Sequence, residues 1–353
     1  FPKPYFWGSR ILKMQNRQFN HKKRKKLSAQ ELFEGITAGN FSALSQGITC
    51  CESLKTDDRE RANQLLKLCL PYSGDSVRIG ITGVPGVGKS TFIESFGLQL
   101  IEKHQKKVAV LAVDPSSERS KGSILGDKTR MELLSRKKDA FIRPSPSSGA
   151  LGGVANQSRE SIILCEAAGF DLIIVETVGV GQSETEVRKM TDFFLLLMLA
   201  GAGDELQGIK RGIMEMADGI LINKADGDNR QAAKLAAGEY RNALHLFPPH
   251  ESEWTAKVDL CSALEKENMD GAWQMINDFV SLTQKNGYFQ SQRQKQLRTW
   301  FTKTIDELLH RSLFDSPKMK AEVKRLEAAV EKKQISPYEA GKKVLEVFRG
   351  EMR

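Results

Sequence analysis

A glycine-rich stretch at residues 83–90 combines the residue types that bind nucleotide phosphates. It follows a predicted strand at 78–82 and runs into a predicted helix, which is the context that a Walker A motif requires. Its glycines let successive backbone N–H groups turn toward the phosphates, and the helix start adds its positive dipole end. Lys89 is expected to bridge the β- and γ-phosphates, and Ser90 to ligate Mg²⁺. The predicted nucleotide-binding residues of this loop are Gly83, Val84, Pro85, Gly86, Val87, Gly88, Lys89, Ser90 and Thr91.

The sequence Asn-Lys-Ala-Asp at 223–226 predicts which base is bound. It follows a predicted strand at 219–223 and matches the NKxD element of GTPases, in which Asp226 would accept hydrogen bonds from N1 and N2 of guanine. Adenine offers no such pair of donors, and one bidentate contact of this kind is worth about 1–3 kcal/mol. Four residues alone are equally compatible with a surface turn, but their position after the phosphate loop favours guanine. The predicted guanine-site residues are Asn223, Lys224 and Asp226, with Cys261, Ser262 and Ala263 at the end of a strand predicted at 257–263.

Three acidic residues are candidates for the metal site. Asp114 ends a predicted strand at 108–113, Asp127 lies in the loop after it, and Glu176 ends another predicted strand at 171–177. Because parallel strands present their carboxyl ends at one edge of a sheet, all three can converge on the phosphate loop. Each is also compatible with a helix cap, although Glu176 follows an apolar strand and precedes Thr-Val-Gly, as a Walker B acid does. The predicted Mg²⁺ ligands are therefore Ser90, Asp114, Asp127 and Glu176.

Gly179 is expected to contact the γ-phosphate, and the residue after it bears on the rate of hydrolysis. Ras-type GTPases place a water-orienting Gln directly after this glycine. This chain has Val180 there, and its nearest Gln is Gln182. Since valine cannot orient water by a hydrogen bond, we expect slow intrinsic hydrolysis. The predicted catalytic residues are Lys89, Asp114, Asp127, Glu176 and Gly179.

The elements that must position these residues alternate between short apolar runs and helical stretches. Strands are predicted at 78–82, 108–113, 171–177, 193–199, 219–223 and 257–263, and helices at 292–313 and 319–348, the last segment opening at a cap at 336. This pattern predicts an α/β fold with a mostly parallel P-loop sheet, helices on both faces and helical segments at both ends. We expect a basic tail at 1–26, an N-terminal helical segment at 27–75 that begins with a capping box, a GTPase domain at 76–286 and a C-terminal helical segment at 287–353.

Charge and cysteine content narrow the classes of function. Residues 1–26 contain nine Lys or Arg and no acid, whereas bases and acids balance in the rest of the 353-residue chain. The net charge of +9 therefore belongs to the tail, and a solvated tail is favoured over a nucleic-acid, membrane or targeting role. The longest apolar run, at 193–200, is too short to span a membrane. Five cysteines, an odd number without metal-ligand spacing, favour a reducing intracellular setting.

Five further segments are specific to one family. At 112–117, 123–131, 141–154, 176–184 and 203–218, the chain closely resembles the methylmalonyl-CoA mutase-associated GTPases. These proteins are called MeaB in bacteria and methylmalonic aciduria type A protein in mitochondria, and also ArgK or LAO/AO transport kinase. The resemblance covers about residues 28–350.

The resemblance implies a homodimeric GTPase, related to the metallochaperone GTPases, that uses GTP and Mg²⁺. It implies a chaperone of an adenosylcobalamin-dependent acyl-CoA mutase of the methylmalonyl-CoA mutase type, which gates cofactor loading and protects the cofactor. By the same resemblance, 114–130, 176–188 and 200–210 are switch segments and the C-terminal helices are a dimerisation arm. A cytoplasmic location is implied for a bacterial protein, and the mitochondrial matrix for a eukaryotic one.

Lys210 lies in the third of these segments, a glycine-rich and charged loop. Its glycines favour mobility, and its charge can reach the nucleotide or the client, so we add Lys210 to the predicted catalytic residues. Composition alone favours a solvated connecting loop.

Two other functions stay open at this point. A kinase linked to amino-acid (LAO/AO) transport would need a motif that activates a phosphate acceptor, and none is present. A metallochaperone GTPase would need a Cys/His ligand cluster, and the pair Cys50-Cys51 is not one.

Overall fold

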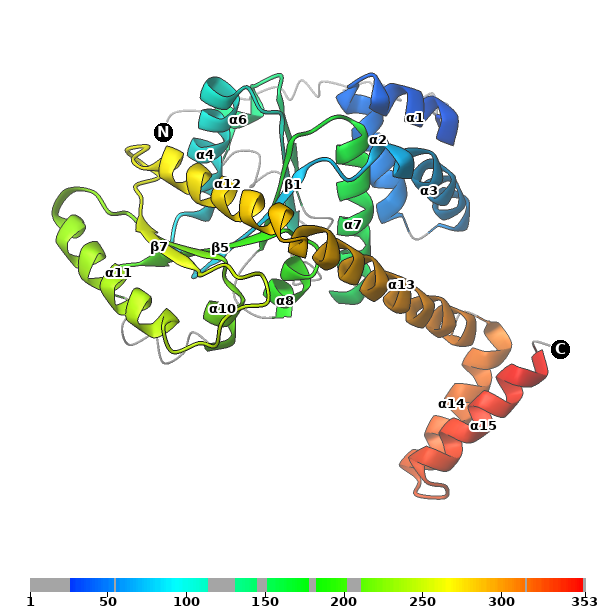
Figure 1. The fold of residues 1–353 in the computed structure, drawn as a ribbon. Coiled ribbons are helices and arrows are strands. Elements are labelled where there is room, and N and C mark those ends of the chain that lie inside the picture. Colours follow the sequence, from blue (N-terminus) through cyan, green and yellow to red (C-terminus); the bar gives the residue numbers. More distant parts are fainter. Residues whose placement is uncertain are drawn as a thin grey trace, which may run out of the picture.

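The computed structural model describes residues 26–53, 55–113, 131–144, 151–177, 182–201, 211–314 and 316–351, without the side chains of residues 151–155, 182, 211 and 351. Seven strands in these ranges form one parallel sheet in the order β3-β2-β4-β1-β5-β6-β7 (Figure 1). Their bounds are β1 (Val77–Gly83), β2 (Val108–Val113), β3 (Ala140–Arg143), β4 (Leu172–Thr177), β5 (Phe193–Leu199), β6 (Gly219–Asn223) and β7 (Lys257–Leu260). The predicted α/β fold is confirmed.

Two strands differ from the prediction. β3 was not predicted, because it has only four residues and ends beside Pro144. β7 ends at Leu260 rather than at residue 263, because Ser262 pairs with Glu267 in an antiparallel bridge that turns the chain away from β6. This early end frees residues 261–263 to form a loop at the carboxyl edge of the sheet.

Alternate residues of the central strands enter two apolar layers. In β4, Leu172 and Ile174 face one layer, and Ile173 and Val175 face the other. The first layer is covered by α4 (Lys89–His104), α6 (Glu132–Ser135), α10 (Arg211–Met216), α11 (Arg230–Leu244) and α12 (Met269–Lys285). The second is covered by α1 (Ala29–Thr37), α2 (Phe41–Glu52), α3 (Thr56–Cys69), α7 (Leu151–Ala167) and α8 (Gln182–Arg188). Apolar side chains on both faces explain why the strands read as continuous hydrophobic runs.

Gly80 allows α8 to lie close against the middle of the sheet. A Cβ at this position would lie 2.9 Å from Cγ1 of Val187 and 2.7 Å from a ring carbon of Phe194. Both distances are shorter than carbon atoms tolerate, so only glycine lets Val187 pack directly on β1. The helix that follows β4 is therefore in contact with the strand that leads into the phosphate loop.

The N-terminal helices begin and attach through specific polar contacts. In the predicted capping box of α1, the Glu31 N–H donates to the Ser28 hydroxyl at 3.2 Å, and the Ser28 N–H donates to the Glu31 carboxylate at 2.7 Å. The Asn40 side chain caps α2. Arg59 of α3 forms a bidentate ion pair with Glu160 of α7, with distances of 2.7 and 2.5 Å. This pair joins the N-terminal helical segment to the helices that cover the sheet.

The five cysteines are all buried and carry free thiols. Cys50 donates its S–H to the carbonyl of Asp58 at 2.9 Å, and Cys51 belongs to the same apolar layer. Burial raises the pKa of the Cys51 thiol well above its ordinary value. Cys50 and Cys51 are therefore buried core residues between α2 and α3.

The C-terminal region is a long helix followed by a helical pair. α13 (Tyr288–Phe314) runs away from the sheet, and α14 (Pro317–Glu331) and α15 (Pro337–Glu351) pack on each other at its far end (Figure 1). The helical region predicted at 319–348 consists of these two helices, and the Ser336 hydroxyl accepts the Glu339 N–H at 3.1 Å where the cap of its last segment was predicted. None of the helices in the described ranges combines the length and apolarity that crossing a membrane requires.

Arg293 holds α13 against the sheet. Its side chain is 8% exposed and donates to both carboxylate oxygens of Asp192 at 2.8 and 2.7 Å. It also donates to the carbonyl of Ser76 at 2.5 Å and to that of Gly74. The guanidinium therefore joins the start of the arm, the entry to β1 and the entry to β5.

We predict that Arg293→Met destabilises the protein strongly. Removing one partner of a buried ion pair leaves the other charge unpaired, which costs about 3–5 kcal/mol. Arg298→Met is the matched control, because Arg298 is exposed on the same helix, and it should change stability by about 0.5 kcal/mol or less. Urea unfolding of both variants measures the difference, and equal stabilities would contradict the assigned anchor.

Candidate functional site

The phosphate loop connects β1 to α4 at the carboxyl edge of the sheet. Gly86 and Gly88 have φ of 78° and 90°, a region that favours glycine. At Gly83 a Cβ would lie 2.4 Å from the carbonyl oxygen of Leu197 in β5, so the strand pairing excludes a side chain there. Val87 is fully buried, which fixes the loop to the core, while residues 85 and 86 are exposed. The loop is thus anchored at its base and open at its tip.

Lys89 spans the base of this loop. Its ammonium donates to the carbonyl of Gly83 at 2.8 Å, and its side chain is half-buried. Burial lowers the pKa of Lys89, and the carboxylates of Glu176 and Glu184 oppose that shift. A cation held this way next to exposed loop amides is suited to bind phosphate oxygens.

Ser90 and Glu176 bring together two oxygen ligands beside Lys89. The Ser90 hydroxyl donates to the Glu176 carboxylate at 3.4 Å, and Glu176 is 7% exposed at the end of β4. Hydroxyl and carboxylate oxygens are the ligands that Mg²⁺ prefers, with phosphate and water completing its shell. The two side chains therefore fit an Mg²⁺ ion.

Asn223 joins the phosphate loop to the loop after β7. The carboxamide nitrogen donates to the Val87 carbonyl at 2.8 Å, and its oxygen accepts the N–H of Ala263 at 3.0 Å. The thiol of Cys261 also approaches that oxygen, at 3.6 Å. The Ser95 hydroxyl of α4 donates to the Ala263 carbonyl at 2.7 Å and adds a second tie. One buried amide thus sets the spacing between the predicted phosphate and base sites.

Asp226 lies half-buried next to this junction. Its carboxylate accepts the hydroxyl of Ser262, which in turn accepts the N–H of Glu265 at 3.1 Å. Ser262 therefore orients the carboxylate that the sequence assigns to guanine. Lys224 is exposed with φ of 58°, and Thr91 is exposed at the start of α4.

Four of the predicted site residues lie outside the described residues. They are Asp114, Asp127, Gly179 and Lys210. The structure therefore brings together the loop 83–91, Glu176, 223–226 and 261–263 at one edge of the sheet, as parallel strands require.

A buried chain of hydrogen bonds behind Lys89 was not predicted from the sequence. The Thr177 hydroxyl donates to the Thr82 hydroxyl at 2.8 Å, and the Thr82 hydroxyl lies 3.5 Å from the Glu184 carboxylate. All three side chains are almost fully buried. The sequence signal for this chain of hydrogen bonds was the presence of polar residues at the ends of apolar strands and in the segment 176–184. This chain connects β4 and β1 to α8.

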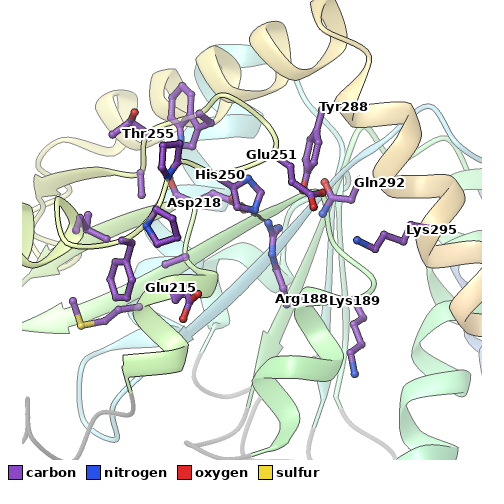
Figure 2. A pocket seen from close by; sticks show the side chains of 18 of the residues that line it. Arg188, Lys189, Glu215, Asp218, His250, Glu251, Thr255, Tyr288, Gln292 and Lys295 are labelled. Atoms are coloured by element: carbon purple, nitrogen blue, oxygen red, sulfur yellow. Dashed lines mark hydrogen bonds and ion pairs between the residues drawn. The ribbon is translucent and has the colours of Figure 1, made fainter.

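A cavity of about 690 Å³ lies at the opposite, amino edge of the sheet, between the loop 244–256 and α13 (Figure 2). Its wall includes the ion pair of Arg188 with Asp218, at 2.8 Å, and Asp218 also accepts the N–H of Phe194 at 2.8 Å. Burial raises the pKa of Asp218 to about 6, although Arg188 opposes the shift. Both side chains stabilise the sheet, and ligands of parallel α/β sheets bind at the opposite edge, so this cavity is not where a nucleotide is expected.

Comparison with known proteins shows the family to which the chain is similar. A family model described as methylmalonyl Co-A mutase-associated GTPase MeaB matches residues 44–318. GTPase ArgK of Escherichia coli (strain K12) is 47% identical over 307 residues, which cover 87% of this chain and 92% of the relative. The mitochondrial methylmalonic aciduria type A homolog of Caenorhabditis elegans is 42% identical over 92% of this chain and 84% of its own length.

A solved structure extends the likeness to three dimensions. The crystal structure of an LAO/AO transport system kinase is 40% identical, with a TM-score of 0.71, over 91% of this chain and 97% of that one. The family match covers most of the chain and includes the phosphate loop, Glu176 and the 223–226 motif. The chain belongs to the MeaB family of methylmalonyl-CoA mutase-associated GTPases.

Proposed function

We propose that this protein is an Mg²⁺-dependent GTPase with one nucleotide site at the carboxyl edge of its sheet. The observation that carries the proposal is the Asn223 carboxamide, bonded to Val87 of the phosphate loop and to Ala263 of the base loop. This arrangement supports a single ligand that has both a polyphosphate and a base. Asp226, oriented by Ser262, supports guanine as that base.

The residues near the expected phosphate position are proposed to have different roles. Lys89 would neutralise charge on the β- and γ-phosphates, and Ser90 and Glu176 would hold Mg²⁺, with Asp114 and Asp127 proposed as further ligands. Bound Mg²⁺ would stabilise the charge that develops on the phosphate oxygens. Gly179 is proposed to contact the γ-phosphate through its backbone. Val180 supplies no hydrogen bond to the attacking water, which supports a slow intrinsic rate.

The proposed partner is an adenosylcobalamin-dependent acyl-CoA mutase of the methylmalonyl-CoA mutase type. The family's description as mutase-associated supports this client. We propose that GTP binding and hydrolysis gate loading of the cofactor and protect it, and that the mutase accelerates hydrolysis through residues 200–210, in particular Lys210. The protein would act in the cytoplasm of a bacterium or in the mitochondrial matrix of a eukaryote. A kinase is kept as the alternative, because the 40% identical protein of known structure is named a transport system kinase.

The C-terminal arm supports a homodimer. Large apolar side chains of α13 are exposed at Leu297, Phe301, Ile305 and Leu308, with exposed fractions of 56, 68, 40 and 59%. Their spacing places them on one side of the helix. Phe301 and its neighbours are therefore proposed to pack against the arm of a second copy.

Guanine selectivity is tested by Asp226→Asn. An amide reverses one donor–acceptor match with guanine, so the affinity for GTP should fall about tenfold to a hundredfold while xanthosine triphosphate binds better than it does to the wild type. Asp228→Asn is the control, since Asp228 is exposed two residues further on. Competition against a fluorescent nucleotide measures both. Undiminished GTP affinity in Asp226→Asn would reject this residue as the guanine contact.

The chaperone role is tested by GTP turnover with and without methylmalonyl-CoA mutase. Groups supplied by activating partners accelerate other GTPases by about 10³–10⁵, so even partial provision should give at least about a tenfold stimulation. Lys210→Ala should keep the intrinsic rate and lose the stimulation. Lys285→Ala, at an exposed position near the end of α12, should keep both.

Three outcomes would contradict parts of the proposed function. Stimulation that survives Lys210→Ala removes this residue from the mechanism. A wild-type rate that no acyl-CoA mutase changes counts against the chaperone role. Transfer of the γ-phosphate to a protein side chain, measured with labelled GTP, would favour the kinase instead.

The dimer is tested by Phe301→Glu. A carboxylate in the centre of an apolar contact is left buried without a partner, so this variant should sediment as a monomer where the wild type sediments as a dimer. Thr302→Glu adds the same charge at an exposed position outside the apolar stripe and should leave the dimer intact. A monomeric wild type, or an unchanged dimer in Phe301→Glu, would refute the proposed interface.

A further inference from the structure

The arm helix α13 contacts α8 and the turn that follows it at several points. Besides the Arg293 anchor, Gln296 donates to the Thr191 carbonyl at 2.8 Å, and Lys303 forms an ion pair with Glu186 of α8. The side chains of Lys303 and Glu186 are 29% and 15% exposed, so this ion pair is partly withdrawn from solvent. A change in the position of α8 must therefore change the contacts of α13. In Figure 2, Gln292 and Lys295 of α13 line the cavity together with Arg188 and Lys189.

The same short helix contacts the nucleotide site through Glu184. This carboxylate is fully buried beside Thr82, the residue before the phosphate loop, and acts on the pKa of Lys89. Phosphate groups bound to Lys89 would draw the ammonium toward themselves and place negative charge near Glu184. Two like charges in a buried setting repel strongly, so phosphate binding exerts a force on α8.

Arg159 of α7 is a buried cation without sufficient partners. It is 6% exposed, and Nη2 donates to the Lys189 carbonyl at 3.5 Å, whereas Nε and Nη1 have no hydrogen-bond partner among the residues that the structure describes. Burial lowers the pKa of this guanidinium, and the Glu186 carboxylate opposes the shift, which places Glu186 within electrostatic reach. Unpaired buried guanidinium nitrogens are rare and costly, so their presence at a helix contact calls for an explanation.

We propose that α8 is a two-position connector in which Glu186 exchanges between Lys303 of the arm and Arg159 of α7, and that phosphate bound at Lys89 drives the exchange. The proposal rests on the proposed GTP site. In the arrangement described here Glu186 holds the arm through Lys303. In the second arrangement the carboxylate satisfies Arg159, and the middle of α13 loses its ion pair with α8. Each arrangement leaves one of the two cations without Glu186, so bound phosphate can shift the balance between them.

The exchange can be measured by hydrogen exchange of the backbone amides at 296–307 in the full chain. With Mg²⁺ and a non-hydrolysable GTP analogue, these amides should exchange at least about fivefold faster than with GDP, the lower limit of typical allosteric couplings. Arg159→Met and Glu186→Gln should bring this ratio to about one. Lys303→Met should exchange fast with either nucleotide. Lys295→Met is the control, because Lys295 is an exposed lysine of the same helix, and it should behave as the wild type does.

Two further readouts separate the possible outcomes. Arg159→Met should leave the melting temperature unchanged or raise it, because it removes an unsatisfied buried cation; a clear fall would assign Arg159 a structural role and overturn the proposal. A nucleotide-dependent ratio that persists in both Arg159→Met and Glu186→Gln would also overturn it. Binding of the analogue is measured in the same samples. A wild type that binds it with a ratio near one contradicts the connector alone, whereas a wild type that fails to bind it contradicts the GTP site as well.

Discussion

The buried side chain of Asn223 holds together the parts of the site that come from distant stretches of sequence. It ends β6 and uses both halves of its amide, one on Val87 of the phosphate loop and the other on Ala263 after β7. Either group left unpaired in the core would cost about 1–3 kcal/mol. The rest of the carboxyl edge depends on this spacing, because Asp226 and Ser262 follow directly from the two bonded segments. A parallel sheet brings loops to one edge, but a side chain such as this one sets their distance.

Much of this arrangement could be predicted from the sequence because it depends on local rules. The strand, loop and helix around Lys89 have fixed glycine and lysine spacing, and a helix start such as Ser28 to Glu31 needs only four residues. Apolar runs long enough to be buried on both faces predicted β2, β5 and β6 with their observed bounds. Parallel pairing then places Glu176 and Asn223 at the edge that carries the phosphate loop.

The features that could not be predicted depend on contacts between distant segments. β3 is too short to have a pattern of its own and exists because β2 offers a free edge. The end of β7 is set by the bridge between Ser262 and Glu267, which the hydrophobic pattern of the sequence does not predict. The chain from Thr177 through Thr82 to Glu184 joins three elements by side chains alone. Arg159 reads as one more charged residue of an amphipathic helix until the packing of α7 and α8 shows it buried.

We propose that this edge of the sheet binds guanine nucleotides in preference to adenine nucleotides. Calorimetric titration of the wild type with GTP and with ATP, each with Mg²⁺, tests it most directly. The carboxylate of Asp226 recognises two donors that adenine lacks, so GTP should bind at least about tenfold to a hundredfold more tightly than ATP. Equal affinities for the two nucleotides would refute guanine recognition at this site.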